Sequence, residues 1–373
     1  MIIGIPREIK DNEYRVAATP EGVREFTDAG HRVLVETGAG AGSAISDADL
    51  SSAGALIADS ATAVWSASEM ILKVKEPVPD EFGFLREGLI LFTYLHLAAG
   101  KGLTEALAGQ GVAAVAYETV QDAQGRLPLL APMSEIAGRM APHIAAGLLE
   151  KERGGRGVLI GGSAGVSPAR VLVLGAGMAG SSAAWIAAGM EAEVLVMDKS
   201  VDRLRFIDEI HRGRIQTLMS SRLAIERLMS TVDVVIGAVL VPGAKAPRLI
   251  SRGMVAEMKP GSVIVDVAVD QGGCVETARM TTHSDPTYVE NGVVHYCVGN
   301  MPGAVPNTST YALTNVTTPY AHAIADLGLR EAARRDRSLA LGINVLEGHV
   351  VNAGVAEAHG IPLSDLDTII RTP

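Results

Sequence analysis

The stretch VLVLGAGMAGSSAAWIA, at residues 171–187, decides how the middle of this 373-residue chain folds. A run of β-branched and other apolar residues leads into a glycine-rich turn and then into alanines, which predicts a strand, a tight turn and a helix. Gly175, Gly177 and Gly180 stand in the order G-x-G-x-x-G, which is typical of a dinucleotide-binding turn when a strand precedes and a helix follows. The uncharged stretch is about as long as a bilayer is thick, but this pattern favours a buried strand and helix over a membrane span.

Each glycine has a physical role in this prediction. Gly175 would allow the tight turn, Gly177 would let the backbone approach a pyrophosphate, and Gly180 would permit close packing of helix on strand. The phosphates would lie at the N-terminus of the helix, where free N–H groups and the helix dipole favour anions. The alternative is a turn that packs the helix without binding a ligand.

The next predicted strand, EVLVMD, ends in Asp198. An acid at this place in a Rossmann domain accepts the ribose hydroxyls of NAD, and its charge repels the 2′-phosphate of NADP. The sequence therefore predicts NAD as the cofactor. Arg203, which would also lie at the cofactor, opposes this inference because an arginine can accommodate a 2′-phosphate.

The composition indicates a folded, soluble protein of two domains. Acidic residues outnumber basic ones by 42 to 32 and no basic stripe occurs, so nucleic acid is not an expected partner. The first residues, MIIGIPREIK, leave no room for the apolar core of a signal peptide. Two cysteines, Cys274 and Cys297, are too few for a disulfide framework. We therefore expect a cytoplasmic protein with reduced thiols and no membrane partner.

Short β-type runs alternate with helical stretches, which predicts α/β domains with parallel sheets and crossover helices. The first series of strands is expected at Ile2–Ile5, Arg32–Glu36, Met70–Val74, Leu89–Tyr94 and Val112–Ala116. The second series is expected at Val171–Leu174, Glu193–Met197, Val232–Ala238, Ser262–Val267 and Val293–Cys297.

A long helix from Pro132 to Lys151, interrupted at Pro142, is expected to join the two series. Further helices are expected at Tyr311–Leu327 and Ser338–Glu347, and the tail, too short for a third domain, should return to the first one. The prediction is two Rossmann-like doubly wound parallel-sheet domains joined by long helices, with a cleft between them. Residues 1–130 plus 306–373 would form a discontinuous substrate domain, and residues 131–305 the NAD-binding domain.

Polar residues that follow the predicted strands are candidates for the site, because ligands of open α/β sheets bind beyond the carboxyl ends of the strands. In the first domain, Arg15 and Lys75 are two cations that suit a small carboxylate with an adjacent carbonyl oxygen. His96 can move a proton near neutral pH. From the second domain, Asp270 could orient an amine, a water or a carbinolamine.

Three of the first-domain candidates have alternatives. Arg15 could be a solvated loop charge, and His96 could be a core histidine with satisfied hydrogen bonds. Glu118, after Val112–Ala116, has no visible partner in the sequence and is expected to support the site rather than to contact the substrate.

Two other candidates have a competitor nearby in the sequence. Lys73 and Lys75 alternate along the predicted strand, so one of them should face solvent, and Lys75 is favoured because it is nearest the strand end. Asp270 could be a turn residue before the glycines. Asp266 is the competing acid, but it lies within the strand.

Together these motifs resemble the bacterial L-alanine dehydrogenases, a family related to the α subunit of nicotinamide nucleotide transhydrogenase. The resemblance covers essentially the whole chain and rests on MIIGIPREIKDNEYRVAATP (1–20), KVKEP (73–77), TYLHLA (93–98), PMSEIAGRM (132–140), VLGAGMAG (173–180), VDVAVDQGG (265–273) and GNMPGAVPNTSTYALTN (299–315). It implies a homohexamer that converts L-alanine reversibly to pyruvate and ammonium with NAD, through hydride transfer and a carbinolamine.

The resemblance also implies roles for residues. Arg15 and Lys75 bind the substrate, His96 is the general acid and base, and Asp270 is the second catalytic residue. NAD contacts are implied at Ser134, Met178, Ala179, Asp198, Ser220, Val239, Leu240, Val267, Ala268, Val269, Asp270, Arg279, Val298, Gly299, Asn300 and Met301. Some relatives have a metal site near the edge of the dinucleotide domain, but the sequence has no secure His/Asp/Glu cluster there, so we expect no required metal.

Two other functions are compatible with the motifs. A transhydrogenase subunit would exchange hydride with a second dinucleotide and associate with membrane-spanning partners, but it would not need Arg15, Lys75 and His96. A non-catalytic NAD(H) sensor would need only the glycine turn and Asp198. Substrate breadth is a separate question, because glycine, glyoxylate or serine could fit a pocket shaped for a methyl group.

Overall fold

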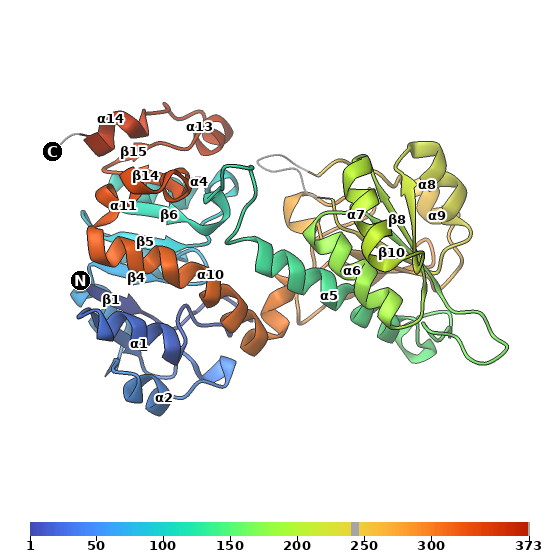
Figure 1. Ribbon diagram of the computed structural model, residues 1–373, viewed down its shortest axis with the longest axis horizontal. Helices are drawn as coiled ribbons and strands as arrows, with labels where there is room; N and C mark the ends of the chain where they lie inside the picture. Colours follow the sequence, from blue (N-terminus) through green and yellow to red (C-terminus); the bar gives the residue numbers. More distant parts are fainter. Residues whose placement is uncertain (240–245, 372–373) are drawn as a thin grey trace. The chain divides into compact units, whose positions relative to one another are not determined.

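In a computed structural model, which describes residues 1–239 and 246–371, the chain forms two compact units. Unit 1 comprises Met1–Met133 together with Val305–Pro373, and unit 2 comprises Ser134–Ala304. The chain leaves unit 1 once and returns to it, so both termini belong to the same unit (Figure 1). No helix of the described residues is both long and apolar enough to cross a membrane.

Unit 1 has a mixed eight-stranded sheet in its described residues. Across the sheet, the strands are β15 (His349–Val350), β14 (Ile343–Leu346), β6 (Ala113–Ala116), β5 (Ile90–Thr93), β4 (Met70–Leu72), β1 (Ile2–Ile5), β2 (Arg32–Glu36) and β3 (Leu56–Ala58). The strands from β6 to β3 are parallel and follow the doubly wound Rossmann order, which reverses between β1 and β4. The loops after β1, β4, β5 and β6 therefore share one edge of the sheet.

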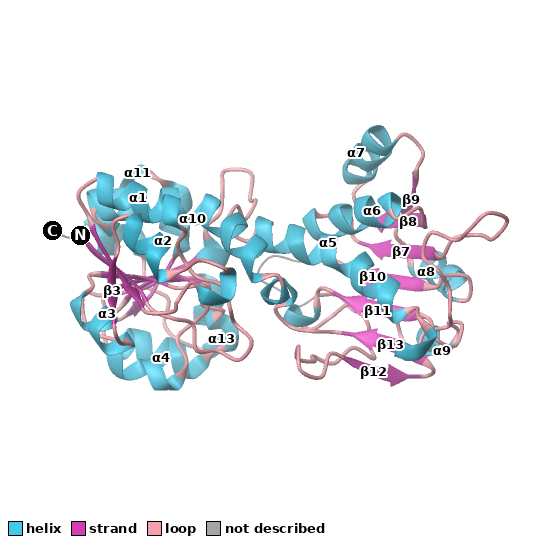
Figure 2. Cartoon of the chain, turned by 90° about the horizontal axis from the view of Figure 1, so that it is seen from below, coloured by secondary structure: helices cyan, strands magenta, loops and turns pink. Residues whose placement is uncertain are grey.

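Helices cover both faces of this sheet. They are α1 (Pro20–Asp28), α2 (Asp47–Ser52), α3 (Ala61–Ala67), α4 (Lys101–Gly109), α10 (Pro306–Leu327), α11 (Leu329–Arg335), α12 (Arg337–Gly342), α13 (Ala353–His359) and α14 (Leu366–Arg371). Figure 2 shows α1, α10 and α11 on one side of the sheet and α3 and α4 on the other.

The sheet of unit 2 has the same winding in its described residues. Across the sheet, the strands are β12 (Thr287–Glu290), β13 (Val293–Tyr296), β11 (Val263–Asp266), β10 (Val234–Gly237), β7 (Arg170–Leu174), β8 (Glu193–Asp198) and β9 (Ile215–Met219). The helices are α5 (Ala131–Leu148), α6 (Met178–Gly189), α7 (Val201–His211), α8 (Arg222–Met229) and α9 (Arg252–Ala256). The predicted fold class is confirmed, with the difference that each sheet has an antiparallel edge.

Strand β7 shows why this sheet lies between two layers of helices. Val171 and Val173 pack in a core with alanines of α5 and α6, whereas Leu172 and Leu174 pack in a second core with residues of α8 and α9. A parallel strand with both faces buried is apolar throughout rather than alternating. The uninterrupted VLVL run in the sequence therefore reflects burial on both sides.

The prediction of a helix over Ser338–Glu347 is wrong in its second half. Helix α12 ends at Gly342, and the following residues form β14, which pairs antiparallel with β6. The strand sequence INVL contains two β-branched residues, and all four residues are buried. The returning tail thus extends the sheet of unit 1.

The predicted interruption at Pro142 is also wrong, because α5 runs from Ala131 to Leu148 without a break. A proline inside a helix removes one backbone hydrogen bond and costs about 3 kcal/mol. Ala137, Ala141 and Ala145 of the same helix are buried in the core of unit 2, and their burial offsets this cost.

Besides β14, the predicted series lacks four strands, β3, β9, β12 and β15, and each of these four forms an edge of its sheet. Their residues are largely half-buried or exposed, so the apolar pattern that identifies a central strand is weak. The other strands occur where they were expected, although β4 ends at Leu72 rather than Val74. The glycine-rich residues 154–166 contain one antiparallel bridge, between Ser163 and Val166.

A buried cluster of three charges joins the loops after β1 and β4. Lys73 Nζ lies 3.0 Å from Glu8 Oε2 and 2.9 Å from Glu81 Oε1, and the three side chains are between 1% and 5% exposed. Burial alone would lower the pKa of Lys73, but attraction from the two carboxylates outweighs it and raises the pKa, so Lys73 stays protonated. Glu8 Oε1 also accepts the N–H of Val74 at 2.6 Å, which ties the first loop to the second.

We expect Lys73→Met to destabilise the protein, because it leaves two buried carboxylates without their cation. Removing one partner of a buried ion pair typically costs about 3–5 kcal/mol, so the urea midpoint should fall clearly. Lys101→Met is a matched control, since its side chain is 63% exposed and its pair with Glu105 lies at the surface. Equal midpoints for the two variants in urea denaturation would contradict the prediction.

Candidate functional site

The glycine turn after β7 has two positions that the backbone itself restricts to glycine. Gly175 has a φ of 102°, and a Cβ there would lie 2.6 Å from the carbonyl oxygen of Ala238. A Cβ at Gly180 would lie 1.8 Å from the carbonyl oxygen of Gly175. Gly177 differs, because the nearest atom to a Cβ there would be Nη1 of Arg203 at 3.9 Å. The space in front of Gly177 is therefore open to a ligand.

The turn leads directly into α6, which starts with Met178 and Ala179. Gly177 precedes the helix and offers no side-chain cap. The first N–H groups of a helix have no partner within it, so an uncapped N-terminus beside open space favours an anion. These residues fit the pyrophosphate of NAD.

Asp198 is the last residue of β8 and is fixed against the glycine turn. Its Oδ2 accepts the N–H of Ala176 at 2.7 Å, and its Oδ1 accepts the N–H of Ser200 at 2.8 Å. Since each carboxylate oxygen can accept a second hydrogen bond, Asp198 also fits the ribose hydroxyls of NAD. Arg203 Nη1 lies 3.8 Å from Asp198 Oδ2 with 60% of its side chain exposed, so the guanidinium is the acid's neighbour on the solvent side.

The two competing acids after β11 have different surroundings. Asp266 is buried, accepts the N–H groups of Ala268 and Cys274 at 3.0 and 2.9 Å, and has its pKa raised to about 6 by burial. It holds the loop that follows the strand. Asp270 is exposed, and its Oδ2 accepts the N–H of Asn300 at 3.3 Å. Asp270 is therefore the acid of this pair that a substrate can reach.

Other predicted NAD contacts follow the parallel strands of unit 2. These residues come after β9, β10, β11 and β13, and they are Ser220, Val239, Val267, Ala268, Val269, Val298, Gly299, Asn300 and Met301. A pocket of about 390 Å³ lies beside Ser220, with Lys199, Leu249 and Ile250 in its lining. Ser134 lies in α5, and Leu240 lies outside the described residues.

Arg279 is a predicted contact that no strand end would have indicated. It lies in the loop between β11 and β12, where its guanidinium stacks on the ring of Tyr288 with 4.0 Å to the ring centre. Its N–H donates to Tyr288 Oη at 2.8 Å. Tyr288 therefore holds both the backbone and the side chain of Arg279.

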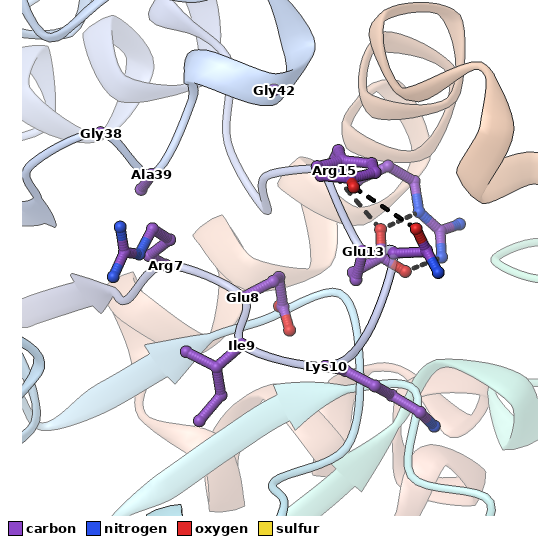
Figure 3. A pocket seen from close by; sticks show the side chains of 11 residues that line it. Arg7, Glu8, Ile9, Lys10, Glu13, Arg15, Gly38, Ala39 and Gly42 are labelled. Carbon is purple, nitrogen blue, oxygen red and sulfur yellow. Dashed lines mark hydrogen bonds and ion pairs between the residues drawn. The ribbon is translucent and has the colours of Figure 1, made fainter. Parts of the chain in front are cut away.

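Arg15 in unit 1 is buried, so the alternative of a solvated loop charge is wrong. The residue is 2% exposed, and its guanidinium pairs with Glu13 at 2.6 Å (Figure 3). The N–H of the next residue, Val16, donates to Oγ1 of Thr310 in α10 at 3.1 Å. The returning tail thus anchors the loop that carries Arg15. A pocket of about 420 Å³ lies against this loop, between the segments that follow β1 and β2.

The expectation that one of Lys73 and Lys75 faces solvent is wrong, because Lys73 is buried in the charge cluster and Lys75 is not exposed either. Lys75 is half-buried, and its N–H donates to Glu8 Oε1 at 3.3 Å. Its neighbour Glu76 was not singled out in the sequence. Burial would raise the pKa of Glu76, but the positive charges of Lys75 and Lys10 and a contribution from His96 lower it. A carboxylate therefore stands among the cations at this edge of the sheet.

His96 is exposed, so the alternative of a core histidine is wrong. Its backbone is left-handed, with φ 49° and ψ 36°, and its ring stacks on Tyr94 with 6.0 Å between ring centres. Glu118 accepts the N–H of Leu95 at 3.2 Å and that of His96 at 2.6 Å. The carboxylate that had no visible partner in the sequence thus holds the unusual backbone turn at His96.

Unit 1 therefore brings Arg15, Lys75, His96 and Glu118 to the loops at one edge of its sheet. Glu13, Glu76 and Tyr94 join them, although sequence reasoning did not identify these three. Burial raises the pKa of Tyr94, so its hydroxyl stays neutral and donates to the carbonyl of Leu129 at 2.6 Å. Within residues 1–239 and 246–371, no three His, Cys, Asp or Glu side chains are grouped as metal ligands.

Comparison with known proteins gives consistent matches over the whole chain. Residues 4–137 match the family model described as alanine dehydrogenase/PNT, N-terminal domain, and residues 141–353 match that of the C-terminal domain. Curated alanine dehydrogenases from Mycolicibacterium smegmatis and Mycobacterium tuberculosis are 54% and 53% identical, over 98% and 99% of this chain and 98% and 100% of their own lengths. Alanine dehydrogenase 2 from Staphylococcus aureus is 53% identical over the full length of both chains.

Two solved structures extend the comparison. One, an L-alanine dehydrogenase, is 48% identical with a TM-score of 0.94, and the match covers 96% of this chain and 99% of that one. The other, a transhydrogenase from Sinorhizobium meliloti, is 26% identical with a TM-score of 0.82, over 94% and 100% of the two chains.

We expect Gly177→Ala to weaken NADH binding by about tenfold or more, since the added methyl group would keep the pyrophosphate from the N–H groups of the turn. The fold should be retained, because the methyl group would project into open space. Gly180→Ala should instead lower the melting temperature, because its Cβ would overlap the carbonyl of Gly175. Fluorescence titration with NADH and thermal melting measure the two effects.

Gly189→Ala, at the other end of α6, is the matched control because nothing lies within 4 Å of a Cβ there. It should bind NADH like the unmodified protein. Unchanged affinity in Gly177→Ala would show that the turn does not hold the pyrophosphate.

Proposed function

This chain belongs to the alanine dehydrogenase/PNT family, and from that premise we propose which of its residues carry out its reaction. It is an NAD-dependent enzyme that converts L-alanine reversibly to pyruvate and ammonium. The observation that carries this conclusion is that the similarity to curated alanine dehydrogenases extends over both units, with 53–54% identity over 98–99% of the chain. The NAD preference agrees with Asp198 at the end of β8.

We propose that one unit binds NAD and that the other binds the substrate. Residues 131–305 would bind NAD, since they contain the glycine turn, Asp198 and the loops after β9 to β13. Residues 1–130 and 306–373 would bind the substrate, since the loops after β1 and β4 contribute Arg15 and Lys75. The anchoring of the Arg15 loop by Thr310 supports the inclusion of the returning tail.

In the proposed mechanism, Arg15 holds the carboxylate of L-alanine through charge-assisted hydrogen bonds. Lys75 places a compact positive charge at the substrate oxygen. Bound NAD supplies the acceptor for the hydride that leaves Cα. The contacts that fix the guanidinium of Arg15 in advance support this assignment, because a fixed carboxylate also fixes the direction of the Cα–H bond.

We assign the proton transfers to His96. It takes a proton from the water that adds to the iminium carbon and returns it to the nitrogen of the carbinolamine, and the hydroxyl proton leaves with the expelled ammonia as ammonium. Lys75 stabilises the negative charge on the oxygen as this hydroxyl loses its proton. Asp270, exposed in the loop after β11, would orient the amine of the substrate. The exposure of His96 and the stacking of its ring on Tyr94 support an imidazole that is reachable and held in place.

We further propose that the enzyme is a cytoplasmic homohexamer with L-alanine, pyruvate and ammonium as its small-molecule partners. The likeness to alanine dehydrogenases supports the substrates, and the resemblance described above supports the assembly. Both cysteines are buried thiols, which agrees with a reducing compartment.

We expect NADH oxidation with pyruvate to depend on ammonium. An alanine dehydrogenase needs ammonium to form the iminium, whereas hydride exchange between two dinucleotides does not. The decrease of NADH absorbance, with and without ammonium, measures this directly. The same assay with glyoxylate and larger 2-oxo acids gives the substrate breadth. Hydride exchange with an added oxidised dinucleotide in place of pyruvate and ammonium would favour the transhydrogenase function, and the absence of turnover in both assays would favour a sensor.

His96→Ala should lose about 10²–10⁴-fold in kcat, the usual contribution of a general acid and base. Its affinity for NADH should not change, because the residues proposed to bind NADH lie in unit 2. His143→Ala, which changes an exposed histidine of α5, is the control and should keep both properties. Near-normal turnover in the His96 variant would refute the assignment.

A further inference from the structure

Glu13 is a fully buried carboxylate that the reaction described above does not use. Its side chain is 0% exposed, and that of Arg15 is 1% exposed. Its Oε1 accepts the Nε–H of Arg15 at 2.7 Å, and its Oε2 accepts an Nη2–H at 2.6 Å. The carboxylate thus accepts two roughly parallel hydrogen bonds from one edge of the guanidinium. Such a pair fixes the orientation of the guanidinium as well as its distance from the carboxylate.

Further contacts hold the rest of the arginine. Nη1 donates to Met133 Sδ at 3.0 Å on another side of the guanidinium. Oε1 of Glu13 also accepts the backbone N–H of Arg15 at 3.1 Å, so one carboxylate oxygen holds both ends of this residue. An arginine side chain loses conformational entropy when it is fixed in one rotamer. Because Arg15 is already fixed before the substrate binds, this entropy loss does not reduce the affinity for the substrate.

We propose that Glu13 is the positioning residue of the substrate-binding arginine, an inference that rests on the role proposed above for Arg15. Glu13 occupies the Nε–Nη2 edge of the guanidinium. A substrate carboxylate that forms two hydrogen bonds with Arg15 therefore does so at the Nη1–Nη2 end. In this way Glu13 sets the direction from which an amino acid or 2-oxo acid is held.

A purely structural ion pair is the competing explanation. A buried guanidinium needs a countercharge, and Glu13 supplies one whether or not Arg15 binds a substrate. The two explanations differ when the arginine side chain is removed. A positioning carboxylate should still bind a free guanidinium ion in the orientation that the substrate requires, whereas a structural pair predicts no return of activity.

The test is chemical rescue with guanidinium. Arg15→Ala should lower kcat/KM for pyruvate, and millimolar guanidinium chloride, far below denaturing concentrations, should restore part of it. In Glu13→Gln/Arg15→Ala the rescue should be weaker by about tenfold or more, since a hydrogen bond to a charged group is lost. Glu21→Gln/Arg15→Ala, which changes an exposed glutamate of α1, should be rescued like Arg15→Ala.

NADH titration and thermal melting identify the variants that are folded. Absence of rescue in Arg15→Ala, or equal rescue with and without Glu13, would overturn the role of Glu13. An unchanged kcat/KM in Arg15→Ala would instead overturn the role of Arg15, so the two failures are distinguishable.

If the double variant does not fold, Glu13→Gln alone decides. Its KM for pyruvate should rise by about tenfold while its KM for NADH stays the same. An equal loss for both substrates would overturn the proposal.

Discussion

An open parallel sheet places the carboxyl ends of its strands along one edge, and both units of this chain depend on that constraint. In unit 1, Arg15, Lys75, His96 and Glu118 are far apart in the sequence, yet each follows a parallel strand and so reaches the same edge. In unit 2 the same order of strands brings the glycine turn, Asp198 and the loops after β11 and β13 to one edge. In the function proposed above, a single topology is used twice, once with cations for a small acid and once with backbone N–H groups for a dinucleotide.

Buried carboxylates in this protein mainly hold loops and cations in place. Glu8 binds Lys73 and the N–H of Val74, Asp266 binds N–H groups of the loop that follows it, and Glu13 binds Arg15. The groups assigned to proton transfer and substrate orientation, His96 and Asp270, are exposed instead. The distinction has a physical basis, because a buried charge must be satisfied by fixed partners and these leave it little freedom to react.

The central strands and the glycine turn could be predicted from the sequence because burial on both faces leaves long apolar runs and because Gly175 and Gly180 are restricted by the backbone. The edge strands could not be predicted, because their residues are partly exposed, as in β9. Without β9, there was also no reason to place Ser220 at the end of a strand. The strand-end rule selected Arg15, Lys75 and His96, but it said nothing of their partners. Glu13 forms an ion pair with Arg15, and Glu118 accepts the backbone N–H of His96. Both contacts depend on the directions of side chains within loops, and loop sequences have no periodicity from which these directions could be predicted. The burial of Lys73 likewise could not be predicted, because it depends on Glu8, which comes from the loop after β1.

The return of the chain to unit 1 has a consequence for biosynthesis. Strand β6 acquires its neighbour β14, and Val16 acquires Thr310, only after more than half of the chain has been added. At typical synthesis rates that interval lasts on the order of ten to sixty seconds. Unit 2 is contiguous in the sequence, and it emerges from the ribosome during this interval. The nascent chain can therefore complete unit 2 while unit 1 still has an unpaired sheet edge, which is the period when chaperones would be most needed.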